Sequence, residues 1–288
     1  MPILSSECLQ KYRIASFRST PAGRLTSVEE AVSFVNERGF IFFWPIKGFL
    51  LPSLWTATAG ERPVPSEHDD PGHITWQWKD QMLGKKQWFY SRILRRKNTV
   101  VSLECLPYFY ALSPNYGDYE SDYLDQYAQG KLTQEAKTIY ETLLFAGTLD
   151  SLELRRRANL WGKENNTRFN RALEDLQIEL KIMPVGIAQA GTWKYAFMYD
   201  ITARHFIELS QQAFSIPEFL ARKKLVEMYL LSLGAVCEAD VNRLFRWRPD
   251  EIKKVLQSLE AERIISSNIQ VEGQSVNWIA HVNLLENA

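Results

Sequence analysis

Two segments in the second half of the chain repeat one pattern of apolar and polar positions. Each carries four apolar residues at i, i+3, i+4 and i+7, a spacing that places four side chains on one face of an α-helix. These residues are Phe169, Ala172, Leu173 and Leu176 in the first copy and Ile252, Val255, Leu256 and Leu259 in the second. A β-branched segment follows each helix: Ile182–Ile187 with a turn at Gly191, and Ile264–Val271 with a turn at Gly273. The pattern therefore predicts a helix and a two-stranded hairpin, twice.

Further helices are expected before each of these segments and near the N-terminus. Thr26, Thr133 and Asp150 are of the residue types that cap helix N-termini, and Gly147 and Gly234 are placed to end helices. Three helices followed by a hairpin form the winged type of helix-turn-helix. The third helix of a helix-turn-helix domain commonly enters the major groove of DNA. The repeated pattern thus points towards nucleic acid.

A third, less regular copy is expected in the N-terminal region, where Trp88–Leu94 and Thr99–Leu103 alternate around a turn at Arg95–Asn98. The fold class that we predict is α+β, mostly helical, with three tandem winged helix-turn-helix units. The expected divisions are an irregular N-terminal unit at 1–114, a bridging helix at 115–131, a second unit at 132–206, a linker at 207–217 and a third unit at 218–288.

Composition restricts the classes of function. Apolar residues make up 45% of the 288 residues, enough for two or three small cores, and 34 Lys and Arg residues balance 34 Asp and Glu residues. DNA-binding domains normally carry a basic excess, so any basic face must be offset by an acidic one. Three separated cysteines make neither a disulfide framework nor a CxxC metal motif. No membrane span or signal peptide is visible, and we expect a cytoplasmic protein without a cofactor.

Two groups of side chains are candidates for binding duplex DNA. One points away from the apolar stripe of the second unit's third helix, and the other forms the turn of the first hairpin. The candidates are Arg168, Asn170 and Arg171 on the helix, and Arg95, Arg96 and Lys97 on the turn. Arginine and asparagine pair bidentately with guanine and adenine edges, and a basic turn suits a clamp on the DNA backbone. A solvated helix face and a protected hairpin edge would have the same composition.

Aromatic and titratable residues gather in the N-terminal unit. Trp44, Trp76 and Trp78 are candidates for stacking on an unpaired base, although compact domains also use such rings as core. In the loop 67–73, His68 and His73 flank two of its three carboxylates, but the spacing matches no metal motif, so no metal site is expected. The carboxylates that could hold an attacking water in this unit are Asp69, Asp70 and Asp80.

The order of the units, together with the segments Leu51–Trp55 and Leu103–Pro107, resembles the winged-helix DNA glycosylases. These bacterial enzymes excise alkylated purines and unhook interstrand crosslinks. The resemblance implies a catalytic triplet, Gln–apolar–Gln or Gln–apolar–Asp, after the first long helix. The corresponding stretch here is Gly39–Pro45, which reads GFIFFWP and contains neither an amide nor a carboxylate side chain. The family's histidine before the matching proline is also absent, since Val100 and Val101 lie there. The chain resembles a divergent relative that lacks the catalytic motif.

Three functions remain open from the sequence. The first is binding of duplex DNA, including damaged or alkylated duplexes, by a relative of the repair glycosylases. The second is an active glycosylase that hydrolyses N-glycosidic bonds with a non-standard catalytic residue. The third is a scaffold for protein–protein interaction, which the zero net charge favours. A polar residue at the bottom of an aromatic cleft in the N-terminal unit would distinguish the enzyme from the binding protein.

Overall fold

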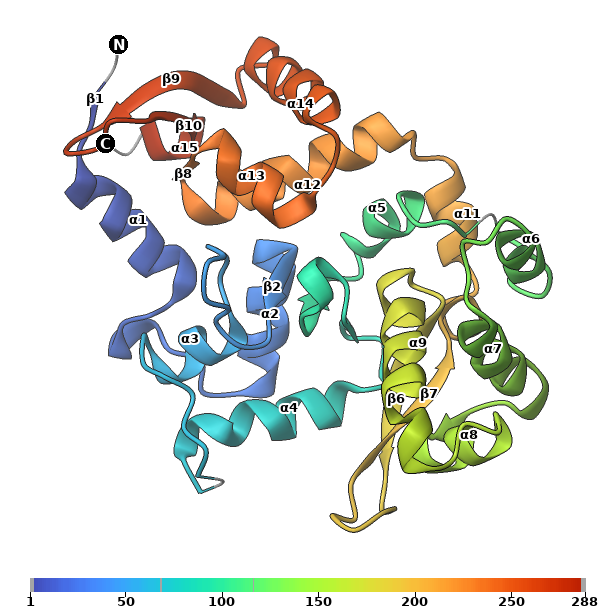
Figure 1. The fold of residues 1–288 in the computed structure, drawn as a ribbon. Coiled ribbons are helices and arrows are strands. Elements are labelled where there is room, and N and C mark those ends of the chain that lie inside the picture. The colour runs from blue at the N-terminus through green and yellow to red at the C-terminus, as the bar shows by residue number, and fades with distance from the viewer. Residues whose placement is uncertain (1–2, 68, 116, 286–288) are drawn as a thin grey trace.

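The computed structural model describes residues 3–67, 69–115 and 117–285 of the chain. Small sheets lie in different parts of a mostly helical molecule, so the mixed and mainly helical class expected from the sequence is confirmed (Figure 1). Figure 1 shows the N-terminal part at the left, the segment 132–206 at the lower right and the segment 218–285 at the top.

The N-terminal part is built on an antiparallel sheet with the strand order β2-β4-β3. Its elements are α2 (Val28–Arg38), β2 (Phe40–Phe42), α3 (Leu54–Ala59), α4 (Ile74–Met82), β3 (Phe89–Ser91), β4 (Thr99–Val101) and α5 (Leu106–Ala111), with 3₁₀ turns η1 (Pro21–Gly23), η2 (Pro71–His73) and η3 (Leu94–Arg96). Ser27 caps α2, one residue later than the expected Thr26, because the Ser27 hydroxyl accepts a hydrogen bond from the Glu30 N–H at 3.2 Å. The Glu30 carboxylate in turn accepts the Thr26 N–H at 2.7 Å.

The segment from 134 to 201 contains three helices followed by a hairpin, as the pattern predicted. Its elements are α7 (Gln134–Ala146), β5 (Leu149–Asp150), α8 (Ser151–Arg157), η4 (Lys163–Asn165), α9 (Asn166–Ile178), β6 (Ile182–Ala188) and β7 (Ala196–Ile201). The four apolar residues of the α9 stripe are all buried. Asp150 caps α8 as expected, since its carboxylate accepts the N–H groups of Leu152 and Glu153 at 2.9 and 3.0 Å.

The segment from 218 to 281 repeats this order. Its elements are α12 (Glu218–Leu233), β8 (Ala235–Val236), α13 (Glu238–Phe245), α14 (Pro249–Ala261), β9 (Ile265–Val271) and β10 (Asn277–His281), and α15 (Val282–Leu285) follows. Pro249 begins α14 at its first position, where a missing N–H costs the helix nothing, and the α14 stripe is buried.

The beginning of the chain joins this third segment in space, which the sequence pattern did not predict. Strand β1 (Ile3–Leu4) pairs in parallel with β9, giving a sheet with the order β1-β9-β10-β8, and α1 (Ser6–Phe17) lies against α12. Figure 1 shows the first strand beside β9 at the upper left.

The connecting segments are also packed. Helix α6 (Asp122–Ala128) lies in the expected bridging region, α10 (Thr202–His205) follows β7, and α11 (Leu209–Phe214) lies in the expected linker. Leu209 and Ala213 of α11 are buried, and this helix contacts α5. In the described residues, no helix combines the length and the apolar content needed to cross a membrane.

Candidate nucleic-acid interface and the aromatic strand

The stretch Gly39–Pro45 follows α2 directly and forms β2. Its side chains alternate between two cores, because successive residues of a strand point to opposite faces. The Phe40 ring packs edge-on against Phe109 of α5 and Phe245 of α13, and the Phe42 ring against Phe49. Ile41 and Phe43 belong to a different core, where the Phe43 ring contacts Tyr90 of β3. Phe40, Ile41, Phe42 and Phe43 are each at most 2% exposed. No side chain of this stretch can orient a water molecule by hydrogen bonding except the indole N–H of Trp44.

Asp80, one of the three candidate carboxylates, is half-buried beside a buried lysine, Lys79. The Lys79 ammonium is 2.9 Å from Asp80 Oδ1 and donates to the Tyr195 hydroxyl at 2.7 Å, while that hydroxyl donates to Asp80 Oδ1 at 2.9 Å. Lys79 is 3% exposed, and burial lowers its pKa although Asp80 opposes this shift. Asp80 is therefore the counter-ion of a buried lysine.

Aromatic rings enclose the Lys79 ammonium. Its Nζ lies 4.6–5.9 Å from the ring centroids of Phe43, Trp76, Tyr90, Tyr195 and Phe197. These rings come from three different parts of the N-terminal region and from β7 and the residue just before it. Cation–π attraction and the ion pair together offset the loss of hydration of the ammonium group.

The other two carboxylates lie in the loop that precedes α4. Asp70 accepts two hydrogen bonds from the Arg62 guanidinium at 2.6 and 2.8 Å and one from the Gly72 N–H at 2.7 Å. The bonds from Arg62 lower the pKa of Asp70 to about 2, so this carboxylate is a weak base, and both of its oxygens already accept hydrogen bonds within the protein. Asp69 is exposed, and His68 lies outside the described residues. The part of the chain that is described brings together no three His, Cys, Asp or Glu side chains that could hold a metal ion.

The three candidate stacking tryptophans differ in exposure. Trp78 is 5% exposed and belongs to the core with Phe43. Trp44 and Trp76 are half-buried, and their ring centroids lie 5.8 Å apart with the planes tilted by 34°. Only part of these two rings could meet a nucleobase.

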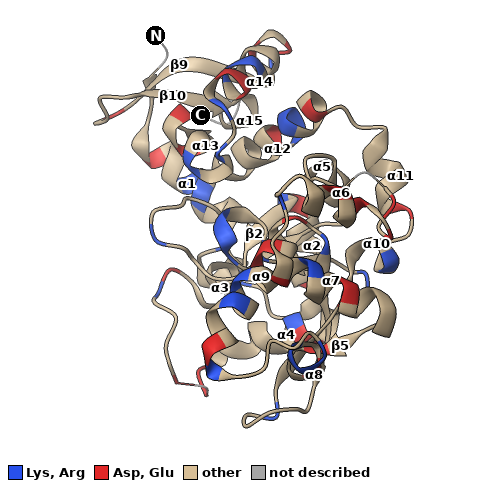
Figure 2. Ribbon diagram, turned by 45° about the vertical axis from the view of Figure 1, so that its right-hand side comes forward, with Lys and Arg blue, Asp and Glu red and all other residues tan. Residues whose placement is uncertain are grey.

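The arginines of the basic turn in the N-terminal hairpin contact two different neighbours, the helix α9 and the ring of Phe49. Arg96 Nη1 lies 2.8 Å from Asp175 Oδ1 and 3.1 Å from Glu174 Oε2, so its guanidinium holds the turn against α9. Arg95 lies with its guanidinium carbon 5.3 Å from the Phe49 ring centroid, and Lys97 is exposed. Figure 2 shows basic and acidic positions interspersed along most elements, in keeping with the balanced charge.

The outer face of α9 carries the other candidates. Arg168 is paired with Glu135 of α7, whose carboxylate accepts its Nε–H at 2.7 Å. Arg171 is 77% exposed and only 4.0 Å from Asp175, the limit of an ion pair. Asn170 is exposed and lines a cavity of about 400 Å³ between α8, α9 and β7, together with Arg92, Asn166 and Tyr199. Arg171 and the two asparagines are therefore the side chains of this face most available to a ligand.

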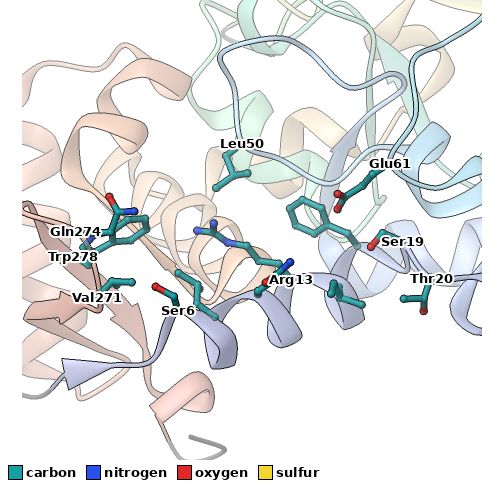
Figure 3. Close-up of a pocket in the computed structure, with 13 residues that line it drawn as sticks. Ser6, Arg13, Ser19, Thr20, Leu50, Glu61, Val271, Gln274 and Trp278 are labelled. Atoms are coloured by element: carbon teal, nitrogen blue, oxygen red, sulfur yellow. The ribbon is translucent and has the colours of Figure 1, made fainter.

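A second cleft, of about 500 Å³, lies between α1 and the β9–β10 hairpin (Figure 3). Arg13, Phe17, Leu50, Glu61 and Trp278 contribute to its walls. The Arg13 guanidinium donates to the Leu233 carbonyl at the end of α12 at 3.2 Å and to the Ala235 carbonyl of β8 at 2.7 Å, and so fixes α1 to both elements. These residues are far apart in sequence, and no local pattern marks them as one site.

Comparisons with known proteins agree on one family. A family model described as AlkZ related matches residues 25–246 of the chain. Among solved structures, the DNA glycosylase AlkZ of Streptomyces sahachiroi has a TM-score of 0.62 and 14% sequence identity, over 100% of this chain and 72% of that one. No curated protein matches the sequence.

Proposed function

The chain belongs to the AlkZ-related family, and on that basis we propose that it binds duplex DNA, including alkylated or otherwise damaged duplexes, without hydrolysing the N-glycosidic bond. The observation that carries this proposal is an AlkZ-like fold around the strand β2, whose side chains are all buried and apolar.

The absence of hydrolysis follows from the chemistry of that strand. Release of a base needs a polar group that holds the attacking water and stabilises the positive charge on the sugar. The stretch Gly39–Pro45 offers phenyl rings where the resemblance to the winged-helix glycosylases implies an amide or a carboxylate. Asp70 and Asp80, the nearest alternatives, are occupied by Arg62 and Lys79.

DNA binding would use three winged units, at 1–114, 132–206 and 218–288, with β1 and α1 of the first range packed on the third unit. The order of three helices and a hairpin in the second and third units supports this division, and the N-terminal sheet would serve as an irregular counterpart. The third helix of the second unit, α9, presents Asn166, Asn170 and Arg171 to solvent. The corresponding face of α14 is less suitable, because Asp250 already binds Arg248 at 2.6 Å.

A panel of unmodified, alkylated and crosslinked duplexes tests the proposal. Each duplex is incubated with the protein and scored for both gel retardation and abasic-site formation, with an active glycosylase as the control for each lesion. Retardation without base release is the expected result. Base release from any duplex would instead support the second function, an active glycosylase. If the protein binds none of the duplexes at low salt, the result would favour a scaffold for protein–protein interaction.

A further inference from the structure

Two arginines from distant parts of the sequence meet where the N-terminal part contacts the third segment. Arg95 lies in η3, and Arg246 is the residue that ends α13; these two elements contact each other. Burial lowers the pKa of Arg95, and the positive charge of Arg246 lowers it further, in keeping with two cations placed at the same contact between η3 and α13.

Neither guanidinium has an anionic partner within the described residues. No ion pair or side-chain hydrogen bond involves Arg95 or Arg246, and the Nε of Arg95 is buried without an acceptor. Neighbouring arginines are different. Arg96 is paired with Asp175, Arg243 with Asp240 and Arg248 with Asp250. In this neighbourhood the structure brings together two cations and leaves them without a carboxylate, which suits a site for an external anion.

The loop that follows β2 contacts Arg95 of this pair and also Arg243 of α13. The Phe49 ring lies under the Arg95 guanidinium, and Arg243 contacts the Gly48 carbonyl at 3.4 Å. The side chains of Lys47, in the same loop, and of Lys97, two residues after Arg95, are exposed. The ring limits the directions in which Arg95 can point, and the lysines extend the positive charge beyond the pair of arginines.

We propose that Arg95 and Arg246 together bind one phosphodiester group of a DNA backbone, with Lys47 and Lys97 facing neighbouring phosphates. A planar guanidinium offers two parallel N–H donors that match two phosphate oxygens, and two such groups supply enough donors for both non-bridging oxygens of one phosphodiester. The flanking lysines favour a continuous polyanion over a single free phosphate. This proposal rests on the proposed function and adds the third segment to the interface, through a residue that no sequence pattern indicated.

The test compares the double variant Arg95→Gln/Arg246→Gln with a control of equal charge, Arg156→Gln/Arg248→Gln. The control arginines are exposed and paired with Glu153 and Asp250. The dissociation constant for a 20-base-pair duplex is measured from low to high NaCl. Losing one phosphate contact should weaken binding roughly tenfold and reduce the slope of log affinity against log salt by about 1, with the control close to wild type. If the Arg95→Gln/Arg246→Gln variant binds as wild type does, or if the control loses as much affinity, the two arginines are not a phosphate site. Either result would leave the proposed DNA binding intact.

A second measurement does not depend on DNA. Without ligand, Arg246→Gln should melt at a temperature at least as high as wild type, because it removes a repulsion between like charges. Inorganic phosphate should raise the melting temperature of wild type more than that of the double variant at matched ionic strength. An equal rise of the melting temperature in both proteins would show that Arg95 and Arg246 do not bind phosphate. A phosphate shift in a wild type that binds no duplex would show a site for a free anion, overturning both the DNA assignment and the proposed function.

Discussion

The Lys79 ammonium lies 2.7 Å from the Tyr195 hydroxyl, a contact that joins α4 to the start of β7 across 116 positions of the sequence. Because Asp80 accepts from the same hydroxyl, the three groups form a closed set of hydrogen bonds between the N-terminal part and the β6–β7 hairpin. A buried lysine without such partners would be strongly destabilising. The contact therefore ties the β6–β7 hairpin to α4.

We predict that Lys79→Ala lowers the free energy of unfolding by about 3 kcal/mol, because it removes packing inside the aromatic cage and leaves Asp80 without its counter-ion. Tyr195→Phe should cost about 1 kcal/mol, the usual value of one hydrogen bond. The double variant should lose less than the sum of the two, since both substitutions break the same network. Urea denaturation of all four proteins measures this, and strictly additive losses would show that the contact is not coupled.

A second buried lysine gives a prediction about pH. Lys181 is 3% exposed and donates to Asn115 Oδ1 at 2.8 Å, and burial lowers its pKa to about 8. An unfolded lysine has a pKa near 10.4, so between pH 8 and 10 the unfolded state binds more protons than the folded state. The free energy of unfolding contributed by this group therefore rises with pH in that window.

The measurement is the difference in unfolding free energy between wild type and Lys181→Met. From pH 7 to pH 9 it should move in favour of wild type by about 1 kcal/mol. Because both proteins share every other titrating group, the comparison isolates Lys181. A difference that stays constant over this range would mean that the lysine is protonated equally in both states.

Gly84, just after α4, offers a test of how closely the N-terminal part approaches β6. Its φ is +72°, and a Cβ added there would lie 2.5 Å from the carbonyl oxygen of Val185. Gly130 has a similar φ of +70° but nothing within 4 Å, so it is a matched control for backbone strain alone. We predict that Gly130→Ala costs about 1 kcal/mol and that Gly84→Ala costs about 2 kcal/mol more. Equal losses in thermal or urea unfolding would place β6 farther from Gly84.

Local signals allowed the sequence to predict much of the fold. The α9 and α14 stripes are buried, and Gly147 and Gly234 end their helices with φ values of +80° and +75°, which glycine adopts readily. Each of these features depends on residues within one or two helical turns. The capping residue of α2 was misplaced by one position because serine and threonine are adjacent there and both can cap.

The candidate site depended on contacts between distant segments, and local patterns could not show them. Arg96 reads as an exposed turn residue, but the register of the hairpin places it beside Asp175 of α9. Asp80 reads as a surface carboxylate, but β7 brings Tyr195 to it. The pairing of β1 with β9 likewise depends on where the chain's first residues return in space. Composition gave the balance of charge, and only the fold shows which charges already have partners.

The last prediction concerns which arginine of α9 meets DNA. Arg171 is largely free, while Glu135 holds Arg168. Arg171→Gln should therefore reduce the salt slope of duplex binding by about 1, and Arg168→Gln should reduce it less. Glu135→Gln should strengthen binding, because it releases the Arg168 guanidinium and removes a negative charge from the same face. Duplex titrations over a range of NaCl concentrations measure all three variants. If Arg171→Gln and Glu135→Gln both bind as wild type does, α9 lies outside the interface. The phosphate site proposed at Arg95 and Arg246 would then be the remaining contact with DNA.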